Sequence, residues 1–235
     1  MNVHLPFADR VAAGRLLARE LASGKTLSLP IDSQRDAAVV LALTRGGVPV
    51  GFQVADRLRI PLDIVVVRKL GVPWQPELAM GAIAGESPIL DDGMIRQLGI
   101  SAADIEEIIA REQAEMRRRE ELYRGGIPAL ALHGRSAILV DDGLATGSTM
   151  LAAVRHVRGL DPARTIIGVP VGSKDACDRL RGEVDDLVCL AVPDLFFAVG
   201  EWYRDFAQVS DAEVKHLLTE SRQQLRKHPA SSATA

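Results

Sequence analysis

The sequence predicts an α/β fold built on an open parallel sheet with helices on both faces. Fully apolar runs recur along the chain, and a segment with helical spacing follows most of them. Glycines and polar residues separate these runs from the helical segments. Strands that are apolar throughout are typical of a parallel sheet that is covered on both sides. We therefore expect one Rossmann-like domain over residues 1–228, which the length of 235 residues allows.

The first half of the chain alternates between helical and extended patterns. Apolar periodicity and turn signals predict these elements in order: a helix over residues 9–22, a strand over 37–43, a helix over 48–58, a strand over 62–67 and a hairpin within 79–90.

The second half begins with a capping box formed by Ser101 and Asp104, which predicts the start of a long charged helix. Gly125 and Gly126 end this helix of about 101–124, which we interpret as an insertion or a dimer element. Continued alternation predicts a strand over 136–141, a helix over 148–159, a strand over 165–171, a helix over 174–181 and a strand over 186–191. The small polar residues 229–235 are expected to be a disordered tail.

Composition excludes several classes of function. The formal charge of −3 gives no electrostatic basis for binding nucleic acid, and no apolar stretch is long enough to span a membrane. Neither the two cysteines nor the five histidines show metal-ligand spacing, so we expect no protein-held metal site. Two cysteines and no signal-peptide pattern indicate a reducing, cytoplasmic location.

The most informative segment is residues 138–149, which read Ile-Leu-Val-Asp-Asp-Gly-Leu-Ala-Thr-Gly-Ser-Thr. An apolar strand ends in two carboxylates, Asp141 and Asp142, and a glycine-bearing turn leads into a helix. The N–H groups and the dipole of a helix N-terminus attract phosphate, and carboxylates accept hydrogen bonds from sugar hydroxyls. The pattern predicts a ribose 5-phosphate site in which the phosphate is held by Ala145, Thr146, Gly147, Ser148 and Thr149. The alternative is an ordinary strand–turn–helix with capping hydroxyls, which would need no acid pair.

Basic residues follow two other predicted strands. Arg45, Gly46 and Gly47 come after the strand over 37–43, and Arg68 and Lys69 come after the strand over 62–67. Loops at the carboxyl ends of parallel strands form the ligand site of an open sheet. Backbone N–H groups and a guanidinium can hold a diphosphate there. The alternative for the first loop is a tight turn with a surface arginine.

Segment 138–149 resembles the signature of the type I phosphoribosyltransferases, with strand, acid pair, hydroxyls and glycine in register. A bacterial subgroup of undefined acceptor substrate is similar over nearly the whole chain. The resemblance implies a type I phosphoribosyltransferase fold with a small C-terminal hood at about 193–206. It implies Mg²⁺-dependent transfer of a phosphoribosyl group from phosphoribosyl diphosphate to a nitrogenous base, by a homodimer. Asp141, Asp142, Arg68 and Lys69 would then be catalytic, and Arg45, Gly46 and Gly47 would bind the diphosphate.

Two further segments take a role from the same resemblance. A mobile loop over Leu70–Glu77 would close over the site, and its Trp74 could cover the ligand, pack on a neighbouring subunit or fill a local core. In the segment that begins at Pro193, Phe197 aligns with a residue that stacks on the base. The alternative for this segment is an aromatic cluster that packs a C-terminal helix.

Other interpretations stay open at this point. A non-catalytic sensor of phosphoribosyl diphosphate or a nucleotide could use the same pocket, and a phosphoribohydrolase or phosphatase would use water as the acceptor. Lys174 could meet a base carbonyl, although a solvated position at a helix start is favoured. Arg117, Arg118 and Arg119 lie among glutamates at helical spacing, which indicates a salt-bridged solvent face.

Overall fold

Five parallel strands form the central sheet of the computed structural model, which describes residues 4–23 and 37–227. Their spatial order is β2-β1-β6-β7-β8, so the chain adds β2 on one side of β1 and later returns to add the other strands on the opposite side. The strands are β1 (Ala38–Leu43), β2 (Leu62–Val65), β6 (Ser136–Val140), β7 (Arg164–Val171) and β8 (Asp186–Ala191). The predicted parallel sheet is confirmed, with strand limits that differ from the predicted ones by a residue or two.

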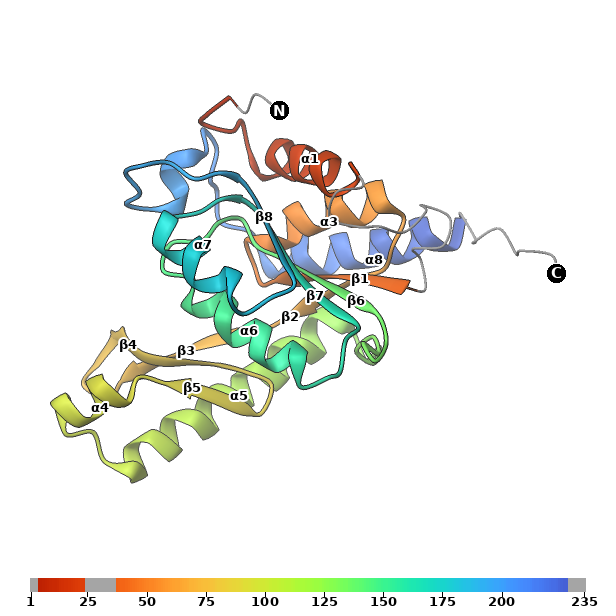
Figure 1. Cartoon of the computed structure of the whole chain (residues 1–235). Coiled ribbons are helices and arrows are strands. Elements are labelled where there is room, and N and C mark those ends of the chain that lie inside the picture. Colours follow the sequence, from red (N-terminus) through yellow and green to blue (C-terminus); the bar gives the residue numbers. More distant parts are fainter. Residues whose placement is uncertain (1–3, 24–36, 228–235) are drawn as a thin grey trace.

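Helices cover both faces of this sheet because alternate residues of each buried strand point to opposite sides. In β1, Val40 and Ala42 belong to one core, whereas Val39 and Leu41 belong to the other. Figure 1 shows α1 and α3 on one side of the sheet and α6 and α7 on the other. The bounds are α1 (Arg10–Leu21), α3 (Gly47–Leu58), α6 (Ser148–Arg158) and α7 (Lys174–Arg181). These helices occupy the predicted segments.

A second, antiparallel sheet projects from the core where the chain leaves β2 (Figure 1). It consists of β3 (Val67–Val72), β4 (Gln75–Ala84) and β5 (Ser87–Leu90), in that order. The hairpin expected within residues 79–90 is therefore confirmed as β4 and β5. A short helix that the sequence analysis did not predict, α4 (Asp92–Leu98), follows this sheet.

The segment Leu70–Glu77 is a β-hairpin end, so its prediction as an irregular loop was wrong. Val72 pairs with Gln75 across a turn formed by Pro73 and Trp74. The ladder shifts register on either side of Gly71, and a Cβ at that glycine would lie 2.3 Å from the carbonyl oxygen of Pro76. Such a bulge tolerates glycine and proline inside a paired strand. Trp74 at the tip is 61% exposed, which excludes the local-core interpretation of this side chain.

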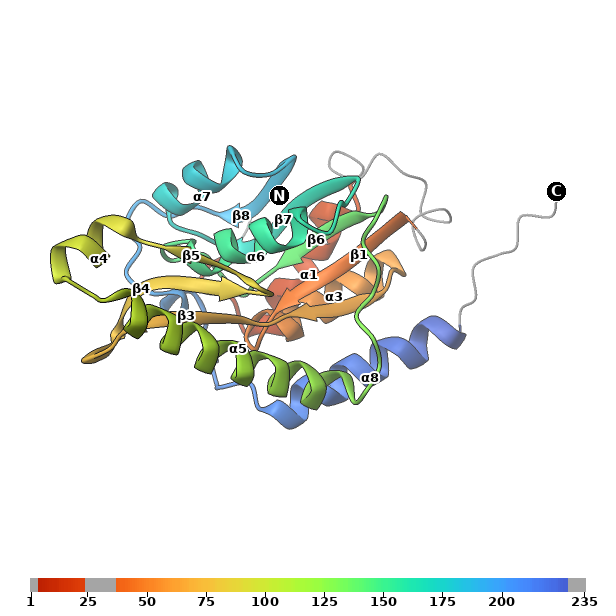
Figure 2. The same ribbon diagram turned by 90° about the horizontal axis from the view of Figure 1, so that it is seen from below.

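The long helix α5 (Ala102–Arg124) begins and ends as predicted. The hydroxyl of Ser101 caps its first turn, and Gly125 ends it in the left-handed conformation. Figure 2 shows α5 running beside β3 and β4 toward the start of α8 (Asp211–Lys227). At its C-terminal end, Arg124 binds the buried carboxylate of Asp63 in β2 at 3.0 Å. This ion pair ties the C-terminal end of α5 to the parallel sheet.

The segment predicted as a hood packs on the N-terminal segment of the chain. It contains a short 3-10 helix, η2 (Val199–Trp202), and its backbone exchanges hydrogen bonds with Phe7 on either side of Tyr203. The rings of Phe7 and Tyr203 lie 5.5 Å apart between centroids. The predicted tail at 229–235 lies outside the described residues. Among the helices that are described, none combines the length and apolar character required to cross a membrane.

Candidate active site

The loops after β1 and β6 lie side by side at the point where the direction of sheet growth reverses. Ala42 pairs with Val140, so Thr44 and Asp141 leave the sheet next to each other. From β1 the chain crosses to β2 on one side, and from β6 it crosses to β7 on the other. Open parallel sheets bind their ligands outside the carboxyl ends of such strands. The two motifs that the sequence analysis singled out therefore meet at one place.

Two glycines allow these loops to interlock. A Cβ at Gly46 would lie 2.1 Å from Oδ2 of Asp142, and one at Gly47 would lie 2.6 Å from the carbonyl oxygen of Val140. Any larger residue would have to displace the acid pair or the end of β6. Close packing therefore requires glycine at positions 46 and 47, and the loop that carries Arg45 lies against the acid pair.

The two acids have different surroundings. Asp142 accepts a hydrogen bond from Nε of Arg10 at 2.8 Å, and its carbonyl oxygen accepts one from the hydroxyl of Tyr203 at 2.5 Å. Burial raises the pKa of Asp142, and the ion pair with Arg10 opposes that rise. Burial, followed by the charge of Asp142, raises the pKa of Asp141 well above its usual value. Asp142 is therefore the acid that is paired with a cation, and Asp141 is the acid that more readily keeps its proton.

The turn after the acid pair has the form of an anion cradle. Gly147 has φ of +72° and offers no side-chain cap to α6. The N–H of Ser148 reaches the hydroxyl of Thr146 at 3.4 Å, and the following N–H groups of the first turn are available to an anion. The hydroxyl of Thr146 lies 3.3 Å from that of Ser148. Two contacts from the neighbouring segment fix the turn: Arg179 of α7 donates to the carbonyl oxygen of Thr146, and Ser173 donates to that of Ala145 at 2.6 Å.

A cavity of about 510 Å³ lies beside this cradle. Its lining includes four predicted site residues: Arg45, Arg68, Lys69 and Thr149. They come from the loop after β1, from strand β3 and from the first turn of α6, which are separate in sequence. The structure therefore gathers the predicted cations and one predicted phosphate ligand around one space.

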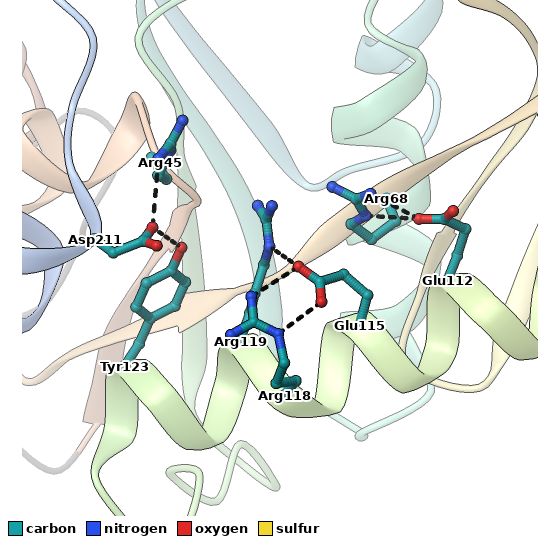
Figure 3. Close-up of polar contacts among 8 residues, drawn as sticks. All are labelled: Arg45, Arg68, Glu112, Glu115, Arg118, Arg119, Tyr123 and Asp211. Atoms are coloured by element: carbon teal, nitrogen blue, oxygen red, sulfur yellow. Dashed lines mark hydrogen bonds and ion pairs between the residues drawn. The ribbon is translucent and has the colours of Figure 1, made fainter. Parts of the chain in front are cut away.

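Helices α5 and α8 supply carboxylates to Arg45 and Arg68, as Figure 3 shows. Glu112 of α5 lies 2.8 Å from Nη2 of Arg68 and is itself buried. Asp211, the first residue of α8, lies 3.4 Å from Nη1 of Arg45 and accepts a hydrogen bond from the hydroxyl of Tyr123 at 2.7 Å. That hydrogen bond lowers the pKa of Asp211, so this acid stays ionised beside Arg45.

Phe197, the residue predicted to stack on the base, lies on the surface. Its side chain is 78% exposed, and it lies outside the residues found around the cavity. Its neighbour Phe196 stacks on Trp202 with 6.1 Å between ring centroids. Phe196 and Trp202 therefore do belong to an aromatic cluster, but it packs on Phe7 and helix α1 and not on a C-terminal helix, whereas Phe197 is exposed.

Several residues at this site were missed from the sequence. Arg10 and Arg179 contact the acid pair and the cradle, yet each lies in an ordinary helical pattern far away in the chain. Arg118 and Arg119 do bind Glu115, as predicted for a salt-bridged helix, but Arg119 also lines the cavity. Lys174 binds Asp178 at 2.6 Å on the surface of α7, in agreement with the favoured surface interpretation.

Comparisons with known proteins agree with this geometry. The family model described as phosphoribosyl transferase domain matches residues 11–205. Two curated proteins from strains of Mycobacterium tuberculosis, "Putative phosphoribosyl transferase MT0597" and "Putative phosphoribosyl transferase Rv0571c", are each 44% identical over 232 residues. The alignments cover 97% of this chain and 50% of each relative, so the chain spans about half their length. The crystal structure of TT1426 from Thermus thermophilus is 41% identical, has a TM-score of 0.75, and matches 92% of this chain and 99% of that one.

Proposed function

The chain belongs to the phosphoribosyl transferase family, and we propose that it moves a ribose 5-phosphate group from phosphoribosyl diphosphate to a nitrogenous base. The observation that carries this proposal is the meeting of the loops after β1 and β6 at the switch point of the sheet, with strand β3 beside the same cavity. An acid pair, an uncapped helix start and a cation-lined cavity lie next to one another there. Phosphoribosyl diphosphate presents ribose hydroxyls, a 5′-phosphate and a diphosphate, which match the acid pair, the helix start and the cavity, respectively.

Each part of the substrate has a counterpart in this arrangement. The 5′-phosphate would sit on the turn over 145–149, where N–H groups and hydroxyls converge. The ribose hydroxyls would donate to Asp141 and Asp142, of which Asp142 keeps Oδ1 for a ligand because Oδ2 receives Arg10. The diphosphate would lie in the cavity with Arg45, Arg68 and Lys69.

In the proposed reaction, catalysis comes from positioning the reactants and stabilising the charges that develop, and less from proton transfer by a side chain. As the bond to diphosphate breaks, positive charge develops on the ribose and negative charge on the leaving group. The acids lie on the ribose side and the cations lie on the diphosphate side, so each charge develops beside its opposite. Holding the base nitrogen near the reacting carbon removes most of the entropic barrier to attack. Phe197, which is exposed in the hood, is the proposed stacking partner of that base.

Mg²⁺ fits this site as an ion that is carried largely by the substrate. Within residues 4–23 and 37–227, no group of three His, Cys, Asp or Glu side chains could hold a metal ion. Mg²⁺ keeps much of its water and commonly uses phosphate oxygens with one or two carboxylates. The acid pair offers such hard oxygen donors beside the proposed phosphates. The ion would neutralise charge on the leaving diphosphate.

A panel of acceptors tests the proposal. The protein is incubated with phosphoribosyl diphosphate, Mg²⁺ and purines, pyrimidines or pyridines in turn, and diphosphate release is measured. Release that depends on one class of base supports transfer and identifies the acceptor class. Release that is equal without any base indicates hydrolysis, and saturable binding without release indicates a sensor; either result contradicts the proposed transfer.

A further inference from the structure

Helix α5 presents a charged face to the cavity, although it lies outside the parallel sheet that carries the acid pair. Figure 3 shows charged side chains rising from this helix toward Arg45 and Arg68. Arg111, Glu112 and Arg119 of α5 all line the cavity. Helix α5 therefore forms one wall of the proposed diphosphate site.

Arg118 and Arg119 share one carboxylate but differ in how they use it. Arg118 binds Glu115 through both Nε, at 2.7 Å, and Nη2, at 3.0 Å. Arg119 binds Glu115 through Nε alone, at 2.7 Å. In the part of the chain that is described, no hydrogen bond satisfies Nη1 or Nη2 of Arg119. Two donor atoms of this guanidinium are therefore available to another acceptor.

The position of Arg119 directs these donors into the cavity. Figure 3 shows its guanidinium reaching away from α5 into the space between Arg45 and Arg68. Its side chain is 28% exposed, whereas that of Arg118 is 59% exposed. The arginine with available donors is thus the more enclosed of the two, and it is the one that lines the cavity.

Glu115 holds Arg119 in this position across the physiological pH range. Its hydrogen bonds from Arg118, and then from Arg119, lower the pKa of Glu115 to about 2. Glu112 and Asp211 hold Arg68 and Arg45 in the same manner. Three guanidinium groups are therefore fixed by carboxylates behind them, and such fixed donors bind an oxyanion without reorganising first.

We infer that Arg119 of helix α5 is a ligand of the diphosphate group, together with Arg45, Arg68 and Lys69. This inference rests on the proposed function and extends it, because it makes helix α5 a part of the binding site. The lining of the cavity carries five cationic side chains against two carboxylates, so its net charge is positive and attracts a group with several anionic oxygens. The planar guanidinium also matches two phosphate oxygens at once.

The test compares Arg119→Gln with Arg118→Gln, because both remove an arginine from the same carboxylate of the same helix. Calorimetry measures binding of inorganic diphosphate with Mg²⁺, and separately binding of ribose 5-phosphate. We expect Arg119→Gln to weaken diphosphate binding about 10- to 100-fold and to leave ribose 5-phosphate binding unchanged. Arg118→Gln should bind both ligands as the wild type does, and Arg119→Lys should be intermediate for diphosphate.

The outcomes separate the inference from the proposed function. If Arg119→Gln binds diphosphate as tightly as the wild type, or loses both ligands together with its folding, Arg119 has a structural role and the inference is overturned. A wild-type protein that binds ribose 5-phosphate but not diphosphate also overturns it. A wild-type protein that binds neither ligand contradicts the proposed function itself.

Discussion

Arg10 donates a hydrogen bond from Nε to Oδ2 of Asp142 over 2.8 Å, and so ties the first turn of helix α1 to the acid pair after β6. The side chains are only 11% and 14% exposed, respectively. The same guanidinium lies 3.8 Å from the ring centroid of Phe206 and donates to the carbonyl oxygen of Ala207 at 2.7 Å. The N-terminal helix and the segment after β8 thus meet at the second acid.

Replacing Arg10 with Gln should move the pH dependence of ligand binding upward. The ion pair with Arg10 opposes the burial that raises the pKa of Asp142. Without the cation, Asp142 stays protonated to a higher pH and accepts hydrogen bonds from ribose hydroxyls less well. As the pH is lowered, we expect Arg10→Gln to lose ribose 5-phosphate binding at a higher pH than the wild type does. Calorimetry from about pH 5 to about pH 8 measures the shift.

The stability of Arg10→Gln provides a second readout. Its free energy of unfolding should fall by about 1.5–3 kcal/mol near pH 8, the usual contribution of a hydrogen bond to a charged group. The loss should shrink as the pH falls, because protonation of Asp142 removes the uncompensated charge. Arg15→Gln is the control, since Arg15 lies in the same helix and meets Gln53 at its surface. Equal, pH-independent losses in both variants would count against a special role for Arg10.

Asp141→Asn should instead stabilise the protein at neutral and alkaline pH. Burial, and then the charge of Asp142, raise the pKa of Asp141 in the folded state. The folded protein therefore binds this proton more tightly than the unfolded chain does, and stability falls as the pH rises from the ordinary pKa of aspartate through the raised pKa. Asn carries no charge, and its oxygen can still accept the hydrogen bond that the N–H of Asp142 donates at 2.9 Å.

Thermal unfolding at several pH values measures this effect. We expect the midpoint of Asp141→Asn to exceed that of the wild type by several degrees near pH 8, since about 1 kcal/mol corresponds to about 2–4 °C in a domain of this size. The two midpoints should converge near pH 4, where aspartate is ordinarily protonated. A constant difference at every pH would show that ionisation of Asp141 does not oppose folding.

Much of the fold could be predicted from local pattern. The buried strands are apolar throughout, and the helices carry periodic apolar residues, so both types of element are visible in a short window of sequence. The acid pair and the turn at Gly147 were predicted because strand, acids and helix start are consecutive residues. Arg45 and Arg68 were predicted because each follows a strand end, and parallel strand ends share one edge.

The remainder depends on contacts that no short window contains. Arg10 is 132 residues away from Asp142, and nothing in the periodicity of α1 distinguishes it from Arg15. The glutamates around Arg119 predicted a salt bridge correctly, but they do not indicate which side of α5 faces the cavity. The segment at Leu70–Glu77 was misassigned because proline and glycine also occur in a bulged strand, which only the pairing with its neighbour shows.

Gly47→Ala should damage the site through packing alone. The new Cβ would lie 2.6 Å from the carbonyl oxygen of Val140 and 2.9 Å from Cα of Asp141, and both are backbone atoms that cannot rotate away. We expect a loss of stability of about 1–3 kcal/mol and weaker ribose 5-phosphate binding, because the acid pair must shift. Gly182→Ala is the control, as the nearest atom to its Cβ would be 4.0 Å away. Unchanged binding and unfolding in Gly47→Ala would contradict the interlocked loops.

Thr146→Ala combined with Thr149→Ala should weaken binding of phosphoribosyl diphosphate by about 2–4 kcal/mol, since a hydrogen bond to a charged group contributes about 1.5–3 kcal/mol and the site adapts in part. Thr149 lines the cavity, and Thr146 lies in the turn that Arg179 holds. Thr219→Ala, which removes a hydroxyl that binds Lys215 within α8, is the control. Calorimetry with normal folding but unchanged affinity would remove these hydroxyls from the phosphate site.

Trp74 should report on the diphosphate through the end of the β3–β4 hairpin. It is exposed at the tip, whereas its near neighbours Pro73 and Pro76 line the same cavity as Arg68 and Lys69. A diphosphate in that cavity would contact the cations at the base of the hairpin and change the surroundings of its tip. A ligand can shift the hairpin only by binding one of its positions better than another.

Fluorescence of a protein with a single tryptophan measures this response. Trp202, the other tryptophan in the chain, stacks on Phe196 in the hood and can be replaced by Phe. In Trp202→Phe protein, emission should change on addition of phosphoribosyl diphosphate with Mg²⁺ and stay constant with ribose 5-phosphate, which would be held at the start of α6. Trp74→Phe protein controls for any signal from Trp202. If both ligands change the emission of Trp74 equally, the hairpin does not sense the diphosphate, and the assignment of Arg68 and Lys69 to that group loses its support.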